Sequence, residues 1–310
     1  MNNYKHTLLV MDKLEFPEDA KKAIIAAEEK IISNEKANKI YESMYRAYWL
    51  KKKNFDYFKD KTKALAEEIN EHIYTVHLVL LLNCTKPLLA KYKSEGISEE
   101  IYWNSILDIK VKTLECKENY DIWGTFVEGW FRGFFNLTRF GLGRFQYDLS
   151  DFGEEIYEDN GIVIKDNEFV LGMHIPSHLG ALTYDVRMDS YKKAFEFFGK
   201  TKGEYIVFMC SSWLVFEGYR EVFKEGSNMA DFMADFDIIK NDYAEENIFS
   251  NSLAVFGMEY NGDTSKFPTD TSLQRNFIKY LNDGKRCGHG HGVIIFDGER
   301  IVNNKRDASE

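Results

Sequence analysis

The stretch "LGMHIPSHLGALTYDV", residues 171–186, decides the fold, because an apolar run passes through Pro176 and Gly180 into a helical pattern. A strand that ends in such a short loop points several backbone N–H groups at one spot, with the dipole of the next helix behind them. That geometry binds phosphate without a basic side chain. The loop, Pro176 to Leu182, is no Walker or dinucleotide motif, since no lysine follows a second glycine. The local sequence leaves two interpretations open, an ordinary turn and an anion cradle.

Three short runs before this loop have the pattern of strands. They are "RFQYDL" at 144–149, "GIVIKD" at 161–166 and "EFVLGMHI" at 168–175. We expect them to pair as an antiparallel meander, with a tight hairpin at Asp166-Asn167.

A helix with an aromatic face is expected after the loop, with Thr183 as its N-cap. The repeating residues are Tyr184, Met188, Tyr191, Phe195 and Phe198. A buried strand follows at 204–213. A strand, a helix and a strand in this order predict a right-handed crossover with two parallel strands.

The remaining patterns complete an α+β fold. Helices are predicted around 228–240 and 271–283, with strands near "SLAVFG" and at 292–296. From Pro17 to about residue 135 the pattern is helical, and one helix is expected to begin near Ser98. We therefore predict a helical N-terminal domain at 1–138, a mixed sheet flanked by helices at 139–300, and a disordered tail at 301–310.

One N-terminal helix has a clear apolar face, and we expect it to end at Asn83, before a break at Pro87. The residues of this face are Leu65, Ile69, Ile73, Val76 and Leu80. Between this helical part and the strands, residues 123–143 are dense in glycine and aromatic side chains, which marks the transition between domains.

Composition excludes several classes of partner. The 310 residues include 40 basic and 50 acidic ones, and the net charge of −10 disfavours nucleic acid and anionic membranes. The four cysteines show no disulfide spacing. The N-terminal apolar run is too short for a signal peptide, and "VHLVLLLNC" is about half a membrane span. These features predict a cytoplasmic protein.

Six segments occur along the chain in a fixed order. They are "FGLGRFQYDL", "HIPSHLGALTYDVRMDSYKKAFEFF", "FMCSSWLVF", "GSNMADFMADFDII", "FPTDTSLQRNFIKYLNDG" and "GHGVIIFDG". The ordered set resembles the bacterial two-domain GNAT-like acyltransferases, which carry a helical N-terminal domain and a GNAT-like C-terminal domain. The resemblance is strongest from about residue 140 to 298, and it implies an acyltransferase more firmly than any substrate.

The resemblance implies acyl-CoA as a co-substrate. In a GNAT fold the loop between the fourth strand and the third helix holds the pyrophosphate, and the pantetheine arm lies where the fourth and fifth strands splay. By order these strands are 168–175 and 204–213. The residues so implied to bind the cofactor are Gly172, Met173, Ser177, His178, Leu179, Gly180, Ala181 and Leu182. The usual Arg/Gln-x-x-Gly-x-Gly/Ala signature is absent from this loop.

Acyl transfer to an amine needs a base, donors for the oxyanion, and an acid for the leaving thiolate. His174, at the end of its strand, is the candidate base, and a structural histidine is the alternative. The resemblance favours a hydroxyl donor from Ser212 or Ser211 near the thioester. Tyr219 is the candidate acid. Cys210 is either an acyl-enzyme nucleophile or inert core.

Other polar or aromatic positions are candidates for substrate contact, each with a structural alternative. Trp130 belongs to an acceptor pocket or to an interdomain core, Asn228 to a substrate site or a helix cap, and Arg275 to a substrate site or a structural pair. The predicted substrate-binding set is Trp130, Cys210, Ser211, Asn228 and Arg275.

Cys287, His289 and His291 stand at alternate positions and resemble part of a metal site. A closed zinc site needs a fourth ligand, which this segment does not supply, so we expect no metal.

The leading prediction is transfer of an acyl group from acyl-CoA, or another phosphopantetheine thioester, to an amine by direct attack. The acceptor is a small molecule or a peptide, and an acyl carrier protein is left open as donor. The alternative is a non-catalytic GNAT-fold binding protein that senses acyl-CoA or another anionic metabolite. The missing phosphate signature keeps that alternative open.

Overall fold

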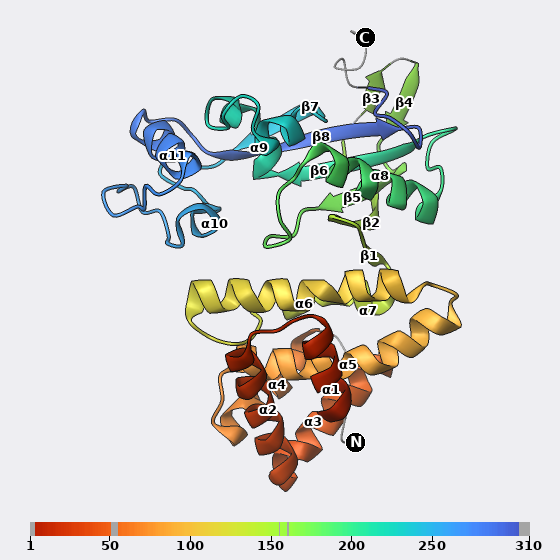
Figure 1. The fold of residues 1–310 in the computed structure, drawn as a ribbon, viewed down its shortest axis with the longest axis vertical. Coiled ribbons are helices and arrows are strands. Elements are labelled where there is room, and N and C mark those ends of the chain that lie inside the picture. Colours follow the sequence, from red (N-terminus) through yellow and green to blue (C-terminus); the bar gives the residue numbers. More distant parts are fainter. Residues whose placement is uncertain (1–3, 51–54, 155, 160, 304–310) are drawn as a thin grey trace. The chain divides into compact units, whose positions relative to one another are not determined.

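The computed structural model describes residues 4–50, 55–154, 156–159 and 161–303 (Figure 1). Contacts divide the chain into two compact units, Met1–Phe140 and Gly141–Glu310. This division lies two residues from the predicted boundary at residue 138. The first unit is helical and the second contains the sheet, as the predicted α+β class requires.

The helical unit is built around α5, which packs against α1, α2, α4 and α6. Ser98 caps α6 by accepting a hydrogen bond from the N–H of Ile101, so the predicted helix start is confirmed. The helices are α1 (Tyr4–Lys13), α2 (Glu18–Ser33), α3 (Glu35–Leu50), α4 (Phe55–Ile69), α5 (Ile73–Ser94), α6 (Glu99–Tyr120), η1 (Glu128–Phe131) and α7 (Arg132–Asn136).

The predicted helix through Leu65 and Leu80 is wrong in both its extent and its end. Asn70 has a φ of 49°, which separates α4 from α5. Pro87 lies inside α5, which continues to Ser94. An internal proline costs about 3 kcal/mol. Burial of most of α5 among the other helices offsets that cost.

Helix α5 is also long and apolar enough to cross a membrane by length and composition. However, 67% of its most apolar window is buried within the structure, which is the pattern of a core helix. The apolar run "VHLVLLLNC" lies within this longer helix. Its burial gives no support to a spanning role.

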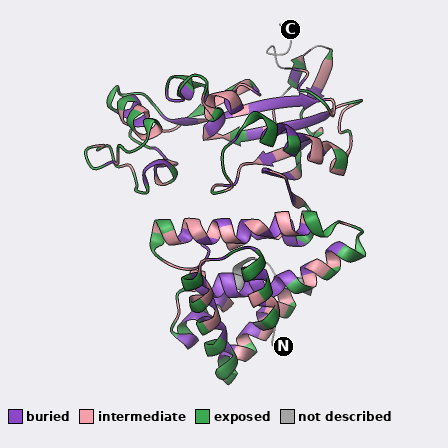
Figure 2. Cartoon of the chain, in the orientation of Figure 1, coloured by how far each residue is buried: buried purple, intermediate pink, exposed green. Residues whose placement is uncertain are grey.

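The second unit has a six-stranded mixed sheet in the order β1-β2-β5-β6-β8-β7 and a separate two-stranded sheet, β3-β4. In Figure 2 the central strands β6 and β8 are buried for most of their length. The strands are β1 (Arg139–Leu142), β2 (Phe145–Asp151), β3 (Ile156–Asp159), β4 (Ile162–Lys165), β5 (Phe169–His174), β6 (Ile206–Ser212), β7 (Asp237–Tyr243) and β8 (Gly288–Phe296).

The predicted meander is wrong because β4 does not pair with either of its expected neighbours. It pairs with β3, and β2 pairs directly with β5 (Figure 1). Asp166-Asn167 is a turn, with Asn167 at a φ of 64°, but it joins strands of two different sheets. The β3-β4 hairpin packs Tyr157 and Ile164 onto the main sheet, which buries both.

The crossover after β5 is confirmed. Helix α8 (Tyr184–Phe198) joins β5 to β6, and the two strands are parallel. Thr183 holds the N-cap position, although its side chain makes no capping bond. Rings from α8 and the sheet form one aromatic layer, in which Tyr191 contacts Phe145 and Phe208.

The two sides of the main sheet are defined by this layer. The α8 face carries Phe145, Tyr147 and Phe208, whose rings pack together beneath α8. Alternation along each strand sends Asp148 and His174 to the opposite face.

Two predictions in the C-terminal third are wrong. The helix predicted at 228–240 is a short α9 (Asn228–Met233) followed by the edge strand β7, and the strand near "SLAVFG" is α10 (Ser252–Phe256). Gly257, in the left-handed region, ends α10. Helix α11 (Ser272–Asn282) and the last strand, β8, confirm the other two.

The first residues of the predicted disordered tail are packed. Ile301 forms a bridge with Phe296, and the buried Asn303 side chain accepts a hydrogen bond from the N–H of Ile295. The rest of the predicted tail, 304–310, lies outside the described residues.

Candidate functional site

The loop between β5 and α8 presents backbone N–H groups in a row. His178 and Gly180 have φ angles of 58° and 81°, which turn the chain sharply toward the helix. Among the residues that the structure describes, none accepts a hydrogen bond from the N–H groups of Leu179 to Leu182. Since Thr183 provides no side-chain cap, the first turn of α8 adds further donors. This arrangement is suited to an anion.

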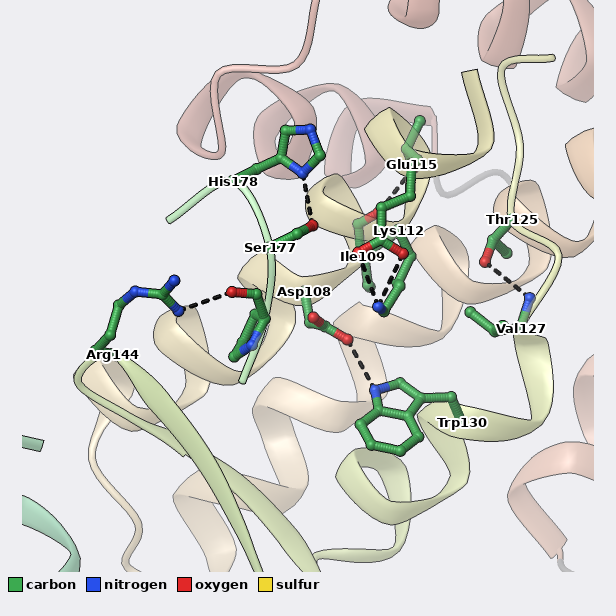
Figure 3. A network of polar contacts seen from close by, with 12 residues as sticks. Asp108, Ile109, Lys112, Glu115, Thr125, Val127, Trp130, Arg144, Ser177 and His178 are labelled. Atoms are coloured by element: carbon green, nitrogen blue, oxygen red, sulfur yellow. Dashed lines mark hydrogen bonds and ion pairs between the residues drawn. The ribbon is translucent and has the colours of Figure 1, made fainter. Parts of the chain in front are cut away.

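Two buried arginines hold the loop through its carbonyl groups. Arg144 Nη1 donates to the carbonyl of Pro176 at 2.8 Å (Figure 3), and its Nη2 donates to that of Gly180 at 3.2 Å. At the other end, Arg187 Nη1 donates to the carbonyl of Leu182 at 2.6 Å. The carbonyl groups are thereby turned toward the interior of the unit, while Ser177 and His178 bond to each other by their side chains.

Strands β5 and β6 part at the end nearer the loop. Their parallel pairing in the described structure consists of Leu171 with Phe208 and Gly172 with Met209, although β5 continues to His174 and β6 to Ser212. The unpaired ends leave backbone groups of both strands for another partner.

His174 lies at this parting and is held by Asp148 from β2. Its Nε2 is 3.2 Å from Asp148 Oδ1, and the two side chains are 31% and 21% exposed. Gly172 makes the pair possible, because a Cβ at that position would lie 2.6 Å from Asp148 Oδ1. The glycine was predicted to admit the pantetheine arm, and the structure shows that its free space is used by a carboxylate.

Sequence reasoning missed Asp148. The residue belongs to a predicted strand, but its partner lies 26 positions further along the chain. Only the direct pairing of β2 with β5 places Asp148 opposite Gly172. The predicted meander, which put another strand between them, concealed the contact.

Models of known families match both parts of the chain. Residues 7–137 match the N-acyltransferase N-terminal domain, and residues 139–294 match the GNAT-like C-terminal domain. The chain belongs to this two-domain family of GNAT-like acyltransferases. The predicted resemblance is thus confirmed, and no curated protein matches the sequence.

Solved acyltransferase structures share the fold of this acyltransferase. One in complex with decanoyl-CoA and teicoplanin has a TM-score of 0.70 at 18% identity, covering 96% of this chain and 89% of its own. One with decanoyl-CoA has a TM-score of 0.70 at 19% identity, covering 94% and 87%. A mutant with octanoyl-CoA has a TM-score of 0.69 at 18% identity, covering 94% and 88%. At these identities the likeness establishes the fold.

The end of β6 places its polar residues on different faces. Cys210 is fully buried on the α8 face of the acyltransferase, and burial raises the pKa of its thiol to about 12. Such a thiol is a poor nucleophile. Ser211 is exposed on the opposite face, whereas Ser212 Oγ accepts a hydrogen bond from the N–H of Leu214.

Tyr219 is fully buried in an aromatic cluster that includes Trp213, Phe223 and Phe277. Burial raises the pKa of its hydroxyl well above the usual value. The hydroxyl also lies 3.4 Å from the N–H of Gly288. These surroundings disfavour the predicted role of Tyr219 as an acid.

The alternating glycines and histidines of β8 serve opposite faces. A Cβ at Gly290 would lie 1.9 Å from the carbonyl oxygen of Val215, and one at Gly292 would lie 2.8 Å from the Phe236 ring. The glycines therefore allow close packing on the α8 face. On the opposite face, His291 Nε2 is 2.8 Å from Asp242 Oδ2. No group of three metal-binding side chains occurs among the described residues.

Two further candidates belong to helices later in the chain, α9 and α11. Asn228 is the exposed first residue of α9, and the neighbouring Ser227 is the helix cap. Arg275 donates to the carbonyl groups of Thr269 and Asp270, just before its own helix.

Trp130 belongs to the helical unit. Its Nε1 donates to Asp108 Oδ2 at 2.9 Å (Figure 3), and the guanidinium of Arg139 lies 3.7 Å from the centre of its ring. The side chain is thus held in one orientation by two contacts. Within the second unit, the structure brings together the predicted loop with Gly172, Met173 and His174.

Proposed function

We propose that this acyltransferase moves an acyl group from acyl-CoA to an amine by direct attack. The observation that carries the proposal is the parting of β5 from β6, with the His174–Asp148 pair at that point. Beyond it lie the N–H groups of Leu179 to Leu182, which have no hydrogen-bond acceptor among the residues that the structure describes. Solved structures of the same fold hold decanoyl-CoA and octanoyl-CoA, which supports an acyl-CoA donor.

The described residues suit the donor's chemistry. The N–H groups of Leu179 to Leu182 and the start of α8 would bind the diphosphate, since they offer donors and a positive helix end. The pantetheine arm carries amide groups, and the unpaired backbone at the ends of β5 and β6 can pair with them. Met173, buried beside this end, and Leu182 supply apolar contact.

His174 is proposed as the general base. When Nε2 donates to Asp148 Oδ1, the lone pair of the ring lies on Nδ1, which accepts a proton from the attacking amine. The carboxylate then stabilises the imidazolium that forms, as the acid partner of a catalytic histidine does. Asp148 is therefore the residue that selects the tautomer of His174.

The reaction is balanced without an enzyme nucleophile. The amine nitrogen forms a bond with the thioester carbon, the C–S bond breaks, and the amine proton passes through His174 to the CoA thiolate. The products are an amide and free CoA. The Ser211 or Ser212 hydroxyl is proposed as a donor to the tetrahedral oxyanion, because both follow the parting in β6.

The acceptor is proposed to be an amine on a small molecule or peptide. One structure of the same fold holds decanoyl-CoA and teicoplanin, and another holds CoA and 10C-teicoplanin. Trp130, Asn228 and Arg275 remain proposals for acceptor contacts. A cytoplasmic location also remains a prediction.

Two measurements test this function. Thermal shift with CoA and octanoyl-CoA tests donor binding, because a ligand of the folded state raises the melting temperature. Release of free CoA thiol in the presence of an amine library tests turnover. Binding of CoA without turnover would favour a non-catalytic sensor. Turnover only with an acylated carrier protein would show that this protein, and not acyl-CoA, is the donor.

The base is tested by His174→Ala, for which we expect a fall in kcat of about 10²–10⁴-fold. His291→Gln is the matched control, since His291 lies on the same face and also contacts an aspartate. Full turnover by His174→Ala would remove this residue from the reaction.

A further inference from the structure

Arg144 occupies an unusual place for a charged side chain. It follows Gly143 in the turn between β1 and β2, and this turn is fixed on α8 because a Cβ at Gly143 would lie 3.1 Å from the Ser190 backbone. Ser190 also accepts a hydrogen bond from the N–H of Phe145. The guanidinium is consequently held under the loop between β5 and α8.

The charge of Arg144 is enclosed but not neutralised. The residue is 8% exposed, and its two terminal nitrogens bind neutral carbonyl groups. Its buried Nε finds no hydrogen-bond partner in the described part of the chain. No carboxylate among the described residues forms an ion pair with it. Burial lowers the pKa of Arg144 to about 10, which leaves the group protonated at neutral pH. A buried, unpaired cation is costly for a protein to keep.

Arg187, in the same unit, is a buried arginine whose charge is neutralised by a carboxylate. It also donates to a loop carbonyl, that of Leu182, but its Nε and Nη2 bind both carboxylate oxygens of Asp235 at 2.6 and 3.0 Å. The two arginines thus support the two ends of one loop. Only Arg144 does so with an uncompensated charge.

We propose that Arg144 is a positioning residue that supplies the fixed positive charge for the diphosphate of CoA, acting from behind the loop. This inference rests on the proposed function. The loop itself carries no lysine or arginine from Pro176 to Leu182. The donors that touch the ligand are backbone N–H groups, and Arg144 strengthens them by binding the carbonyl groups of the same loop and by its charge. Binding of the dianion completes the charge pairing that Arg144 lacks.

The test separates the charge of Arg144 from its hydrogen bonds. Arg144→Lys keeps a charge and a donor, whereas Arg144→Gln keeps a donor and loses the charge. The affinity for CoA is measured by calorimetry for each folded variant. Turnover of an octanoyl-pantetheine thioester, which has no diphosphate, is measured in parallel.

We expect Arg144→Gln to bind CoA about tenfold to a hundredfold more weakly, as the loss of a charged contact does, and Arg144→Lys to recover most of that affinity. Turnover of the pantetheine thioester should be affected equally by the two substitutions, since this substrate has no diphosphate on which the charge could act. Arg144→Met, of similar length and without charge, replaces Arg144→Gln if the latter does not fold.

Two results would overturn the inference. One is wild-type affinity for CoA in the uncharged variant. The other is an equal loss in Arg144→Lys and Arg144→Gln, which would show that loop shape alone matters. A wild-type chain that bound no CoA would instead overturn the proposed function.

Discussion

On the α8 face of the main sheet, polar groups are enclosed and matched. Arg187 binds Asp235 at two points, and the Tyr191 hydroxyl donates to the same carboxylate, all in the buried interior. On the opposite face, Asp148 with His174 and Asp242 with His291 are only partly covered. A half-covered pair can exchange protons with a ligand, and an enclosed one cannot. The enclosed pair therefore maintains the fold, and the half-covered pairs are available for chemistry, whereas the β3-β4 hairpin covers another part of their face.

Breaking the enclosed pair should have the largest effect on stability. Arg187→Met removes the guanidinium that pairs with the buried Asp235 carboxylate, which lowers the free energy of unfolding by about 3–5 kcal/mol. Urea denaturation measures the change. The double variant Arg187→Met/Asp235→Leu should recover part of it, and a stable single variant would show that this face is less enclosed than the structure indicates.

Breaking the half-covered pair should instead reduce activity. In Asp148→Asn the amide can donate to His174 and favour the wrong tautomer, so we expect kcat to fall at least about a hundredfold. The melting temperature should stay close to that of the wild type. Asp242→Asn, which changes the matched pair at His291, is the control for activity. Equal losses in both variants would contradict a specific role for Asp148.

Cys210 provides a further test of the enclosed face. Because burial raises the pKa of its thiol to about 12, we expect no alkylation of this residue in the folded protein at pH 8, and full turnover by Cys210→Ala. Mass spectrometry after iodoacetamide treatment measures the first, and the thiol-release assay measures the second. The substitution should cost about 1 kcal/mol of stability by opening a small cavity. A loss of turnover would revive the acyl-enzyme alternative.

The smallest effect concerns His289 on the opposite face. Burial, followed by the charge of His291, lowers the pKa of His289 against an opposing effect of Asp242. Because the unfolded chain has the higher pKa, it binds more protons as the pH falls through about 6.5, and the folded state loses stability. When the pH is lowered from 7.5 to 5.5, the melting temperature of His289→Gln should therefore fall less than that of the wild type. Identical curves for His289→Gln and the wild type would contradict a lowered pKa of His289 in the folded protein.

The parts of the fold that local sequence specifies were predictable. The loop between β5 and α8 and the cap at Ser98 depend on residues close together in the chain, and the parallel crossover follows from the order of strand, helix and strand. The other elements depend on burial and on strand pairing between distant parts of the chain. Packing keeps α5 helical through Pro87, and β4 prefers β3 to the neighbours that sequence order suggested.

The candidate site was also predictable only where local sequence specifies it. His174 and the loop were found from one continuous stretch, whereas Asp148 and Arg144 reach that stretch from β2 and from the turn before it. Neither has a local signal, because an aspartate in a strand and an arginine after a glycine are both common. Their roles arise from the register of β2 against β5.

The absence of a side chain at Gly172 couples two positions that should vary together in related sequences. A side chain at 172 would collide with the carboxylate at 148, so the two sites cannot vary independently. Relatives that carry a larger residue at the position of Gly172 should lack the acid, and those that keep the acid should keep glycine. Paired inheritance of this kind can be sought in related sequences, and it would separate members that use a carboxylate-supported histidine from members that work in another way.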